Sequence, residues 1–206
     1  MTTATAQAFW DKIAPRYAQK PIANMDAYHE TMARTQSYLS PKDHVLEVGC
    51  GTGSTAILLS DHVAAITGMD ISPAMIEIAK GRAAEKGDGA PRFTVADAAA
   101  PMDHPFNAVL GFNLLHLTPD VPGTLTALAH NLKPGGLLIT KTPCLGGKRW
   151  LFGPMVGIMR ALGKAPRVGF LTARGLDATI EAAGFEIIET GFHPAPMNRF
   201  VVARKR

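Results

Sequence analysis

The 206-residue sequence lacks the marks of several protein classes. Its only cysteines, Cys50 and Cys144, are too few for a disulfide framework, so a cytoplasmic, reducing location is expected. No apolar run reaches the ~18 residues of a membrane-spanning helix, and the pattern of the first residues leads us to expect no secretory signal. Aromatic residues are scarce at 7%, but apolar residues reach 47%, which suits one α/β domain of ordinary size and excludes a disordered chain.

Acidic residues are missing from one long interval. None lies between Asp120 and Asp177, while the interval holds eight cations: Lys133, Lys141, Lys148, Arg149, Arg160, Lys164, Arg167 and Arg174. Because 13 basic and 17 acidic residues remain elsewhere, the net charge of +4 hides a basic segment in a mildly acidic protein. Such a segment attracts anions such as a substrate, a lipid headgroup or a phosphate backbone. A solvated basic face is an equally simple interpretation.

From His44 onward, short β-branched runs alternate with helical segments. Strands are expected at 45–48, 64–69, 93–95, 108–112, 137–140, 186–189 and 200–203, and helices at 55–60, 73–82, 125–132 and 176–183. The Pro-Gly-Gly run at 134–136 is expected to separate a helix from the next strand. The alternation predicts a doubly wound parallel sheet, whose ligands bind beyond the carboxyl ends of the strands.

Two parts of the chain fall outside this alternation. Residues 1–40 are expected to form an N-terminal helical cap of two amphipathic helices, and residues 41–206 the main domain. Within the main domain, residues 144–171 make an insertion too long for an ordinary loop. This insertion is expected to be a lid or a binding element.

A glycine-rich turn follows the first strand, in the run Val-Leu-Glu-Val-Gly-Cys-Gly-Thr-Gly at 45–53. Glycines there let the backbone approach a ligand where any Cβ would collide with it. Glu47, within the strand, suits a ligand with a positive charge such as an α-ammonium group and would repel a pyrophosphate. Cys50 is interpreted as a small filler of the turn without a nucleophilic role.

Two further carboxylates follow at the ends of the next strands. Asp70 lies 17 residues after Gly53 and can accept hydrogen bonds from both hydroxyls of a ribose. Asp97 is placed to accept one from an adenine amino group. Each aspartate alone could instead cap a helix. Acids at three successive strand ends together predict a ligand that contains a nucleoside.

Four segments together resemble the class I S-adenosylmethionine-dependent methyltransferases of the small-molecule type. They are VLEVGCGTG, MDIS at 69–72, the strand that ends at Asp97, and LKPGGLLI at 132–139. The resemblance covers roughly residues 43–206, and FWDKIAPRYA at 9–18 is similar to an N-terminal helix of many small-molecule members. It implies a Rossmann-like, doubly wound seven-stranded sheet in the order 3-2-1-4-5-7-6, with the last strand antiparallel.

The resemblance also implies S-adenosylmethionine as the cofactor and a set of residues that bind it. These are Glu47, Gly49 and Gly51 at the methionine end, Asp70 at the ribose, Asp97 and Ala98 at the adenine, Tyr17 closing over the ligand, Asn113 and Leu114 along the path of the methyl group, and Cys50, Gly53, Ile71 and Met75 around them.

Departures from the family pattern narrow the reaction. Asn113 is not followed by the Pro-Pro-aromatic sequence of the DNA-base and glutamine methylating enzymes, and it replaces an acid of metal-dependent members, so no metal is expected. His116 and Tyr17 are the candidate catalytic residues. A histidine with a pKa near 6.5 can take a proton from a hydroxyl or ammonium acceptor. His116 could instead orient a loop. Methyl transfer from an activated donor depends mainly on alignment, so it can proceed without a strong base.

The insertion indicates the kind of acceptor. Met155, Ile158, Met159 and Leu162 share one helical face, which is expected to cover the acceptor site. Trp150 and the basic residues of 148–167 are also typical of a helix at a membrane interface, which suggests transient contact with a membrane surface. The expected acceptor is a small amphipathic or anionic molecule, lipid-like or quinone-like, and no nucleic acid is expected as a partner.

Two other functions fit parts of the sequence. A nicotinamide-dependent oxidoreductase shares the glycine turn and the later acid, but Ser54 stands at the third glycine of GxGxxG and Glu47 opposes phosphates. A non-catalytic module could bind RNA or a membrane through the basic segment 133–174, which offers few aromatic side chains for stacking on bases. The acceptor, the methylated atom and the oligomeric state stay open.

Overall fold

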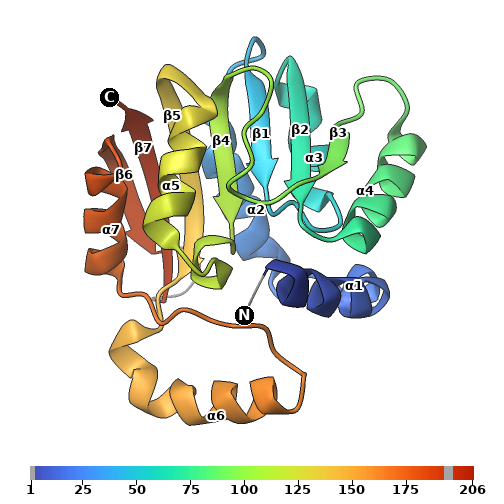
Figure 1. Ribbon diagram of the computed structural model, residues 1–206. Helices are drawn as coiled ribbons and strands as arrows, with labels where there is room; N and C mark the ends of the chain where they lie inside the picture. Colours follow the sequence, from blue (N-terminus) through green and yellow to red (C-terminus); the bar gives the residue numbers. More distant parts are fainter. Residues whose placement is uncertain (1–2, 193–196) are drawn as a thin grey trace.

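The computed structural model describes residues 3–192 and 197–206, which form one seven-stranded sheet with helices on both faces (Figure 1). The strands are β1 (His44–Val48), β2 (Ala65–Asp70), β3 (Arg92–Val95), β4 (Phe106–Phe112), β5 (Leu132–Pro143), β6 (Phe185–Phe192) and β7 (Asn198–Lys205). Their order is β3-β2-β1-β4-β5-β7-β6. Strands β1 to β5 are parallel and β7 is antiparallel to both of its neighbours, which confirms the predicted topology.

Seven α-helices and three short 3-10 turns complete the described part of the chain. They are α1 (Thr3–Gln19), α2 (Met25–Gln36), α3 (Ser54–Leu59), η1 (Ser60–His62), α4 (Pro73–Lys86), η2 (Leu115–Leu117), α5 (Val121–His130), η3 (Gly146–Lys148), α6 (Arg149–Ala161) and α7 (Ala173–Ala182). The Ser72 hydroxyl accepts a hydrogen bond from the Met75 N–H and so caps α4. None of the described helices combines the length and apolar character needed to cross a bilayer.

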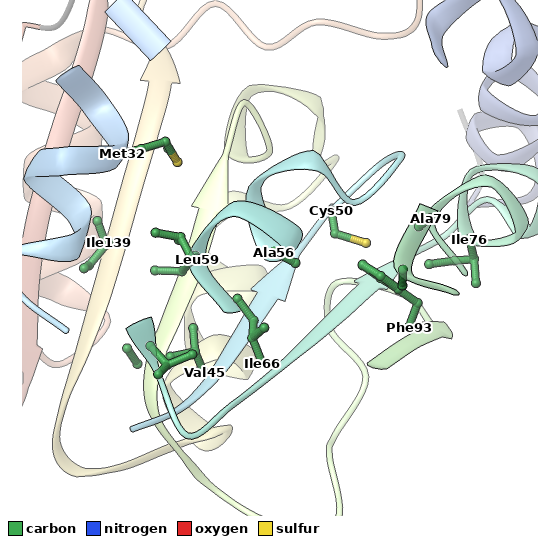
Figure 2. Packing of buried hydrophobic residues seen from close by; sticks show 14 of the residues in the cluster. Met32, Val45, Cys50, Ala56, Leu59, Ile66, Ile76, Ala79, Phe93 and Ile139 are labelled. Atoms are coloured by element: carbon green, nitrogen blue, oxygen red, sulfur yellow. The ribbon is translucent and has the colours of Figure 1, made fainter. Parts of the chain in front are cut away.

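Side chains that alternate along the strands build one core on each face of the sheet. On the first face, Val45, Ile66 and Ile139 lie under α2 and α3, and Phe93 packs near α4 (Figure 2). On the second face, the buried side chains of the central strands pack with those of α5 and α7. The two cores leave the carboxyl ends of β1 to β4 as the place where loops can form a site.

The boundaries predicted for α5 and for the strand that follows it were wrong. Helix α5 begins at Val121 and not at 125, because Asp120 caps it by accepting a hydrogen bond from the Gly123 N–H. The Pro-Gly-Gly run at 134–136 does not separate two elements but lies inside β5, at an irregularity where the pairing with β4 shifts register. A Cβ at Gly136 would come within 3.0 Å of the Asn107 carbonyl oxygen of β4, so only glycine fits this irregular strand.

The helix in the insertion differs most from the expectation. The apolar face of α6 was expected to cover the acceptor site, yet no residue of α6 is buried or lines the main cavity. The helix stands apart from the sheet, beyond its carboxyl edge (Figure 1). The segment that follows, residues 166–168, reaches the cavity instead.

Candidate cofactor and acceptor site

A cavity of about 700 Å³ opens at the carboxyl ends of β1 to β4, a volume within the usual range for sites of small molecules. Helix α1 closes one side of it with Trp10 and Tyr17, and residues 166–168 close part of the other. Most of the predicted site residues line it: Tyr17, Gly49, Gly51, Asp70, Ile71, Met75, Asp97, Ala98, Asn113, Leu114 and His116. Glu47, Cys50 and Gly53 do not line it.

The Asp70 carboxylate is held in place at the end of β2. One of its oxygens accepts a hydrogen bond from the Gly51 N–H and the other from the Ser72 N–H, each at 2.9 Å. Burial raises the pKa of Asp70, and the nearby Asp11 adds to the rise while the two N–H donors oppose it. Because Ser72 is the residue that caps α4, Asp70 is not the helix cap. Its remaining lone pairs are available to a ligand in the cavity.

Asp97 lines the same cavity with an exposed side chain. One of its carboxylate oxygens accepts a hydrogen bond at 2.9 Å from the Ala99 N–H, which forms a tight turn after β3. This bond fixes the direction of the carboxylate. The second carboxylate oxygen can accept a hydrogen bond from a ligand in the cavity.

Glu47 lies behind the glycine turn and is buried. Burial raises the pKa of this carboxyl from 4.5 to about 8, and the charge of Asp70 contributes to the rise. Its Oε2 atom has no hydrogen-bond partner among the described residues. The pKa of Tyr17 is also raised, first by burial, then by the charge of Asp70 and then by the charge of Glu47. The three side chains therefore share one environment. A buried carboxyl with a free acceptor oxygen fits a cationic ligand group.

All three glycines of the turn have left-handed backbones, but a Cβ added at each would meet different surroundings. A Cβ at Gly51 (φ +52°) would point into open space bounded by Tyr17, whose Cε1 is 4.0 Å away. At Gly49 a Cβ would lie 3.0 Å from Leu114 Cδ1, and at Gly53 it would lie 2.6 Å from Phe93 Cζ. Gly51 therefore shapes the cavity wall, whereas Gly53 allows packing in the core.

The Cys50 side chain points into the core beside Phe93 (Figure 2). Burial raises the pKa of its thiol, so the sulfur stays protonated and unreactive. This placement agrees with the interpretation of Cys50 as a filler of the turn.

Helix α1 is fastened to α4 at two points. The Asp11 carboxylate accepts hydrogen bonds from the Ser72 hydroxyl at 2.6 Å and the Ala74 N–H at 3.1 Å. The Arg82 guanidinium donates to the Thr52 hydroxyl and to the Ala18 carbonyl oxygen, both at 2.8 Å. These bonds hold Tyr17 over the cavity. Neither Asp11 nor Arg82 was predicted as part of the site, because no local motif marks a partner from another helix.

The opposite end of the cavity is formed by the segment after β4. Asn113 has φ +54°, the only left-handed non-glycine backbone in the described chain, and its N–H donates to the Lys141 carbonyl oxygen at 2.7 Å. The His116 carbonyl oxygen accepts a hydrogen bond at 2.6 Å from the Gly169 N–H, which ties residues 166–169 to this segment. Strained backbone at such a place is frequent in functional sites.

The His116 imidazole lines the cavity and is neutral at pH 7. Burial lowers its pKa from 6.5 to about 4. Its Nδ1 atom is buried and has no hydrogen-bond partner in the described part of the chain. The ring can therefore accept a proton or a hydrogen bond from a ligand.

Comparison with known proteins agrees with this geometry. The sequence profile described as the methyltransferase domain matches residues 10–190. The chain belongs to the class I S-adenosylmethionine-dependent methyltransferases. The nicotinamide-dependent alternative gains no support from this match.

Two relatives and one solved structure are similar to this methyltransferase. It is 31% identical over 140 residues to demethylmenaquinone methyltransferase of Tropheryma whipplei, over 66% of this chain and 58% of that protein. It is 27% identical over 191 residues to ubiquinone biosynthesis O-methyltransferase of Nitrosospira multiformis, over 89% and 78%. Magnesium protoporphyrin IX methyltransferase of Synechocystis, with bound S-adenosylhomocysteine, has a TM-score of 0.77 at 18% identity and full coverage of both chains. The chain thus spans 58% of the length of the first of these relatives.

S-adenosylmethionine, the cofactor of this family, fits the residues that are present. The bare wall at Gly51 leaves room for a ligand backbone. Behind this turn, the buried Glu47 carboxyl does not line the cavity, but its Oε2 has no hydrogen-bond partner among the described residues. Asp70 and Asp97 face the same cavity, as a ribose and an adenine on one ligand require. In the part of the chain that is described, no three His, Cys, Asp or Glu side chains are grouped to hold a metal ion.

Proposed function

We propose that the protein transfers a methyl group from S-adenosylmethionine to a ring hydroxyl of a small amphipathic aromatic acceptor, of the lipid-like or quinone-like kind. One observation carries the proposal: the neutral His116 imidazole and the fixed Asp70 carboxylate line a single cavity. The names of two relatives, which refer to menaquinone and ubiquinone, support an acceptor of this kind.

The chain's own residues would bind the donor from the turn to the end of β3. Glu47 would pair with the ammonium group, Asp70 with the ribose hydroxyls, and Asp97 and Ala98 with the adenine. Tyr17, held by α1, would cover the ligand and exclude water. When bound, S-adenosylmethionine supplies a methyl group on a positively charged sulfur, which is already activated for displacement. Alignment of the acceptor oxygen is then the main task of the protein.

The acceptor would lie at the end of the cavity near His116. Phe112, Leu117 and Val168 give this end apolar walls, and Arg167 provides a cation at its edge. As the new oxygen–methyl bond forms and the sulfur–methyl bond breaks, the hydroxyl proton would pass to the neutral His116 imidazole. Asn113 and Leu114 would border the path of the methyl group, because both line the cavity and the Leu114 side chain lies against Gly49.

An assay with isotope-labelled S-adenosylmethionine tests the proposal. The purified chain is incubated with dihydroxybenzene acceptors that carry or lack a prenyl tail, and products are identified by mass spectrometry. We expect O-methylated products, with the tailed acceptors preferred. Calorimetry with S-adenosylhomocysteine and NAD measures cofactor choice separately. If S-adenosylhomocysteine binds but no hydroxylated ring is methylated, the proposed acceptor class is wrong while the family assignment stands.

A further inference from the structure

Helix α6 presents its apolar side to the solvent. Leu151, Met155, Ile158 and Leu162 follow one another at steps of four and three residues and so form a single stripe along the helix, which we call the outer stripe. Their side chains are 52%, 50%, 64% and 63% exposed. The less exposed residues, Phe152 and Val156, lie on the other side of the helix.

This orientation is the reverse of that of an ordinary surface helix. An amphipathic helix of a water-soluble domain turns its apolar stripe towards the core. Single exposed apolar residues are common on protein surfaces, but a contiguous set on one helix face marks an interaction site. Trp150, at the start of the helix, is a further large apolar side chain in the solvent, with 79% of its surface exposed. The outer stripe therefore calls for a partner that covers it.

The charges around the outer stripe indicate which partner this is. Cations stand at both ends of the helix and no acid accompanies them between 121 and 176; the flanking cations are Lys148, Arg149, Arg160, Lys164 and Arg167. A tryptophan, an apolar stripe and flanking cations are the features of a helix that lies in the interface of an anionic bilayer. The aromatic ring and the long basic side chains then reach the headgroups while the stripe enters the acyl region.

We infer that α6 docks the protein on anionic lipid bilayers through the outer stripe and its flanking cations. The cavity is close to this surface along the chain, because residues 166–168 line it and Gly169 bonds to the His116 carbonyl oxygen. A docked helix would bring the cavity next to the lipid phase. Docking on a bilayer requires neither the methyl donor nor the acceptor, so the docking can be disproved while the proposed methyl transfer holds.

Flotation of the full chain with vesicles tests this inference. Vesicles of phosphatidylglycerol and phosphatidylcholine are compared with vesicles of phosphatidylcholine alone, without donor or acceptor. We expect binding to the anionic vesicles that weakens as salt rises. Ile158→Ser should reduce binding at least tenfold, whereas Leu58→Ser, at an exposed leucine of α3, should leave it unchanged.

Charge and insertion are tested by matched variants. Replacing Lys148 and Lys164 with Gln should weaken binding roughly 25-fold, about fivefold for each cation, whereas Lys42→Gln with Lys80→Gln should not. The emission of Trp150 should shift to the blue on anionic vesicles; Trp150→Phe should abolish the shift and Trp10→Phe should keep it.

Other occupants of the stripe predict other outcomes. A second copy of the chain would give a dimer that Ile158→Ser dissociates and that ignores vesicles. An RNA partner would give binding to single-stranded RNA with no partition to lipid. A dimer of this kind or binding to RNA in place of lipid would overturn the inference. Equal binding to both kinds of vesicle, or unchanged binding by the α6 variants, would overturn it as well.

Discussion

Arg82 on α4 donates a hydrogen bond to the carbonyl oxygen of Ala18, the residue that follows Tyr17 on α1. Through Thr52, the same guanidinium also reaches the turn whose glycines line the cavity. One side chain thus fixes the helix that closes the site and the loop that forms its floor. Arg82 therefore stabilises the end of the cavity that is expected to bind the cofactor, although Arg82 itself does not line the cavity.

Replacing Arg82 with Met keeps the length of the side chain and removes these bonds. Hydrogen bonds to a charged group contribute about 1.5–3 kcal/mol, and part of this stabilises α1 over the cavity. We expect the Kd for S-adenosylhomocysteine to rise about tenfold, with faster amide exchange in residues 3–19. Lys86→Met, which breaks the Lys86–Asp61 pair on the same helix, is the control. Unchanged affinity in the Arg82 variant would show that α1 closes the site without it.

Gly51→Ala tests the bare wall of the cavity. The backbone strain of about 1–2 kcal/mol is matched by Gly163→Ala, because Gly163 has φ +65° and no atom within 4 Å of its added Cβ. Both variants should lose similar stability by thermal unfolding. Only Gly51→Ala should weaken binding of S-adenosylhomocysteine, by about tenfold or more. Equal affinities in the two variants would contradict the role given to Gly51.

Glu47 makes the stability of the free protein depend on pH. Its folded pKa of about 8 exceeds 4.5, so the folded state binds more protons than the unfolded state between these values. Its contribution is complete below pH 4.5 and is lost as the pH rises towards 8. We expect the free energy of unfolding to fall across this window by about 3–5 kcal/mol relative to Glu47→Gln, measured by urea titration. Parallel pH profiles of the two proteins would contradict the burial argument.

Donor binding should release a proton from the same carboxyl. Glu47 is largely protonated at pH 7 in the free protein and must ionise to pair with an ammonium group. Calorimetry with S-adenosylhomocysteine in buffers of different ionisation enthalpy should therefore show close to one proton released at pH 7, and much less with Glu47→Gln. Binding without proton release would place the ammonium group elsewhere.

His116 should set an acidic limb of the rate profile. Since its pKa in the free protein is about 4, kcat/KM should not change near pH 6.5 on its account and should fall only towards pH 4. His116→Gln should lower kcat about 100-fold and leave the Kd for S-adenosylhomocysteine unchanged, whereas His130→Gln, on the exposed end of α5, should leave both unchanged. A midpoint near 6.5 or a fully active His116 variant would assign the base elsewhere.

The parts of the site that the sequence predicted are those fixed by local geometry. Gly49, Gly51, Asp70 and Asp97 follow strands directly, and parallel strands bring their carboxyl ends to one edge, so spacing along the chain becomes proximity in space. The order of all seven strands followed from the family resemblance and not from periodicity. The register irregularity in β5 was missed because a glycine-proline run has the same composition in a loop and in an irregular strand.

Tertiary contacts explain what could not be predicted. Asp11 and Arg82 act across helices that lie far apart in the sequence, and helical spacing gives no partner for either. The apolar stripe of α6 was visible in the sequence, but the direction it faces depends on where the connecting segments hold the helix. Periodicity shows that a helix has two sides and cannot tell which side meets the rest of the molecule.

The reversed direction of β7 has a practical use. Leu137 of β5 pairs with Arg204 of β7. Residues 204–206 therefore lie at the amino-terminal edge of the parallel strands. There the Arg206 N–H bonds to the Gly184 carbonyl oxygen, at the edge opposite to the cavity. A fluorophore or surface anchor attached beside Arg206 would leave donor, acceptor and lipid free to reach the opposite edge, so ligand and membrane binding can be followed on one immobilised protein.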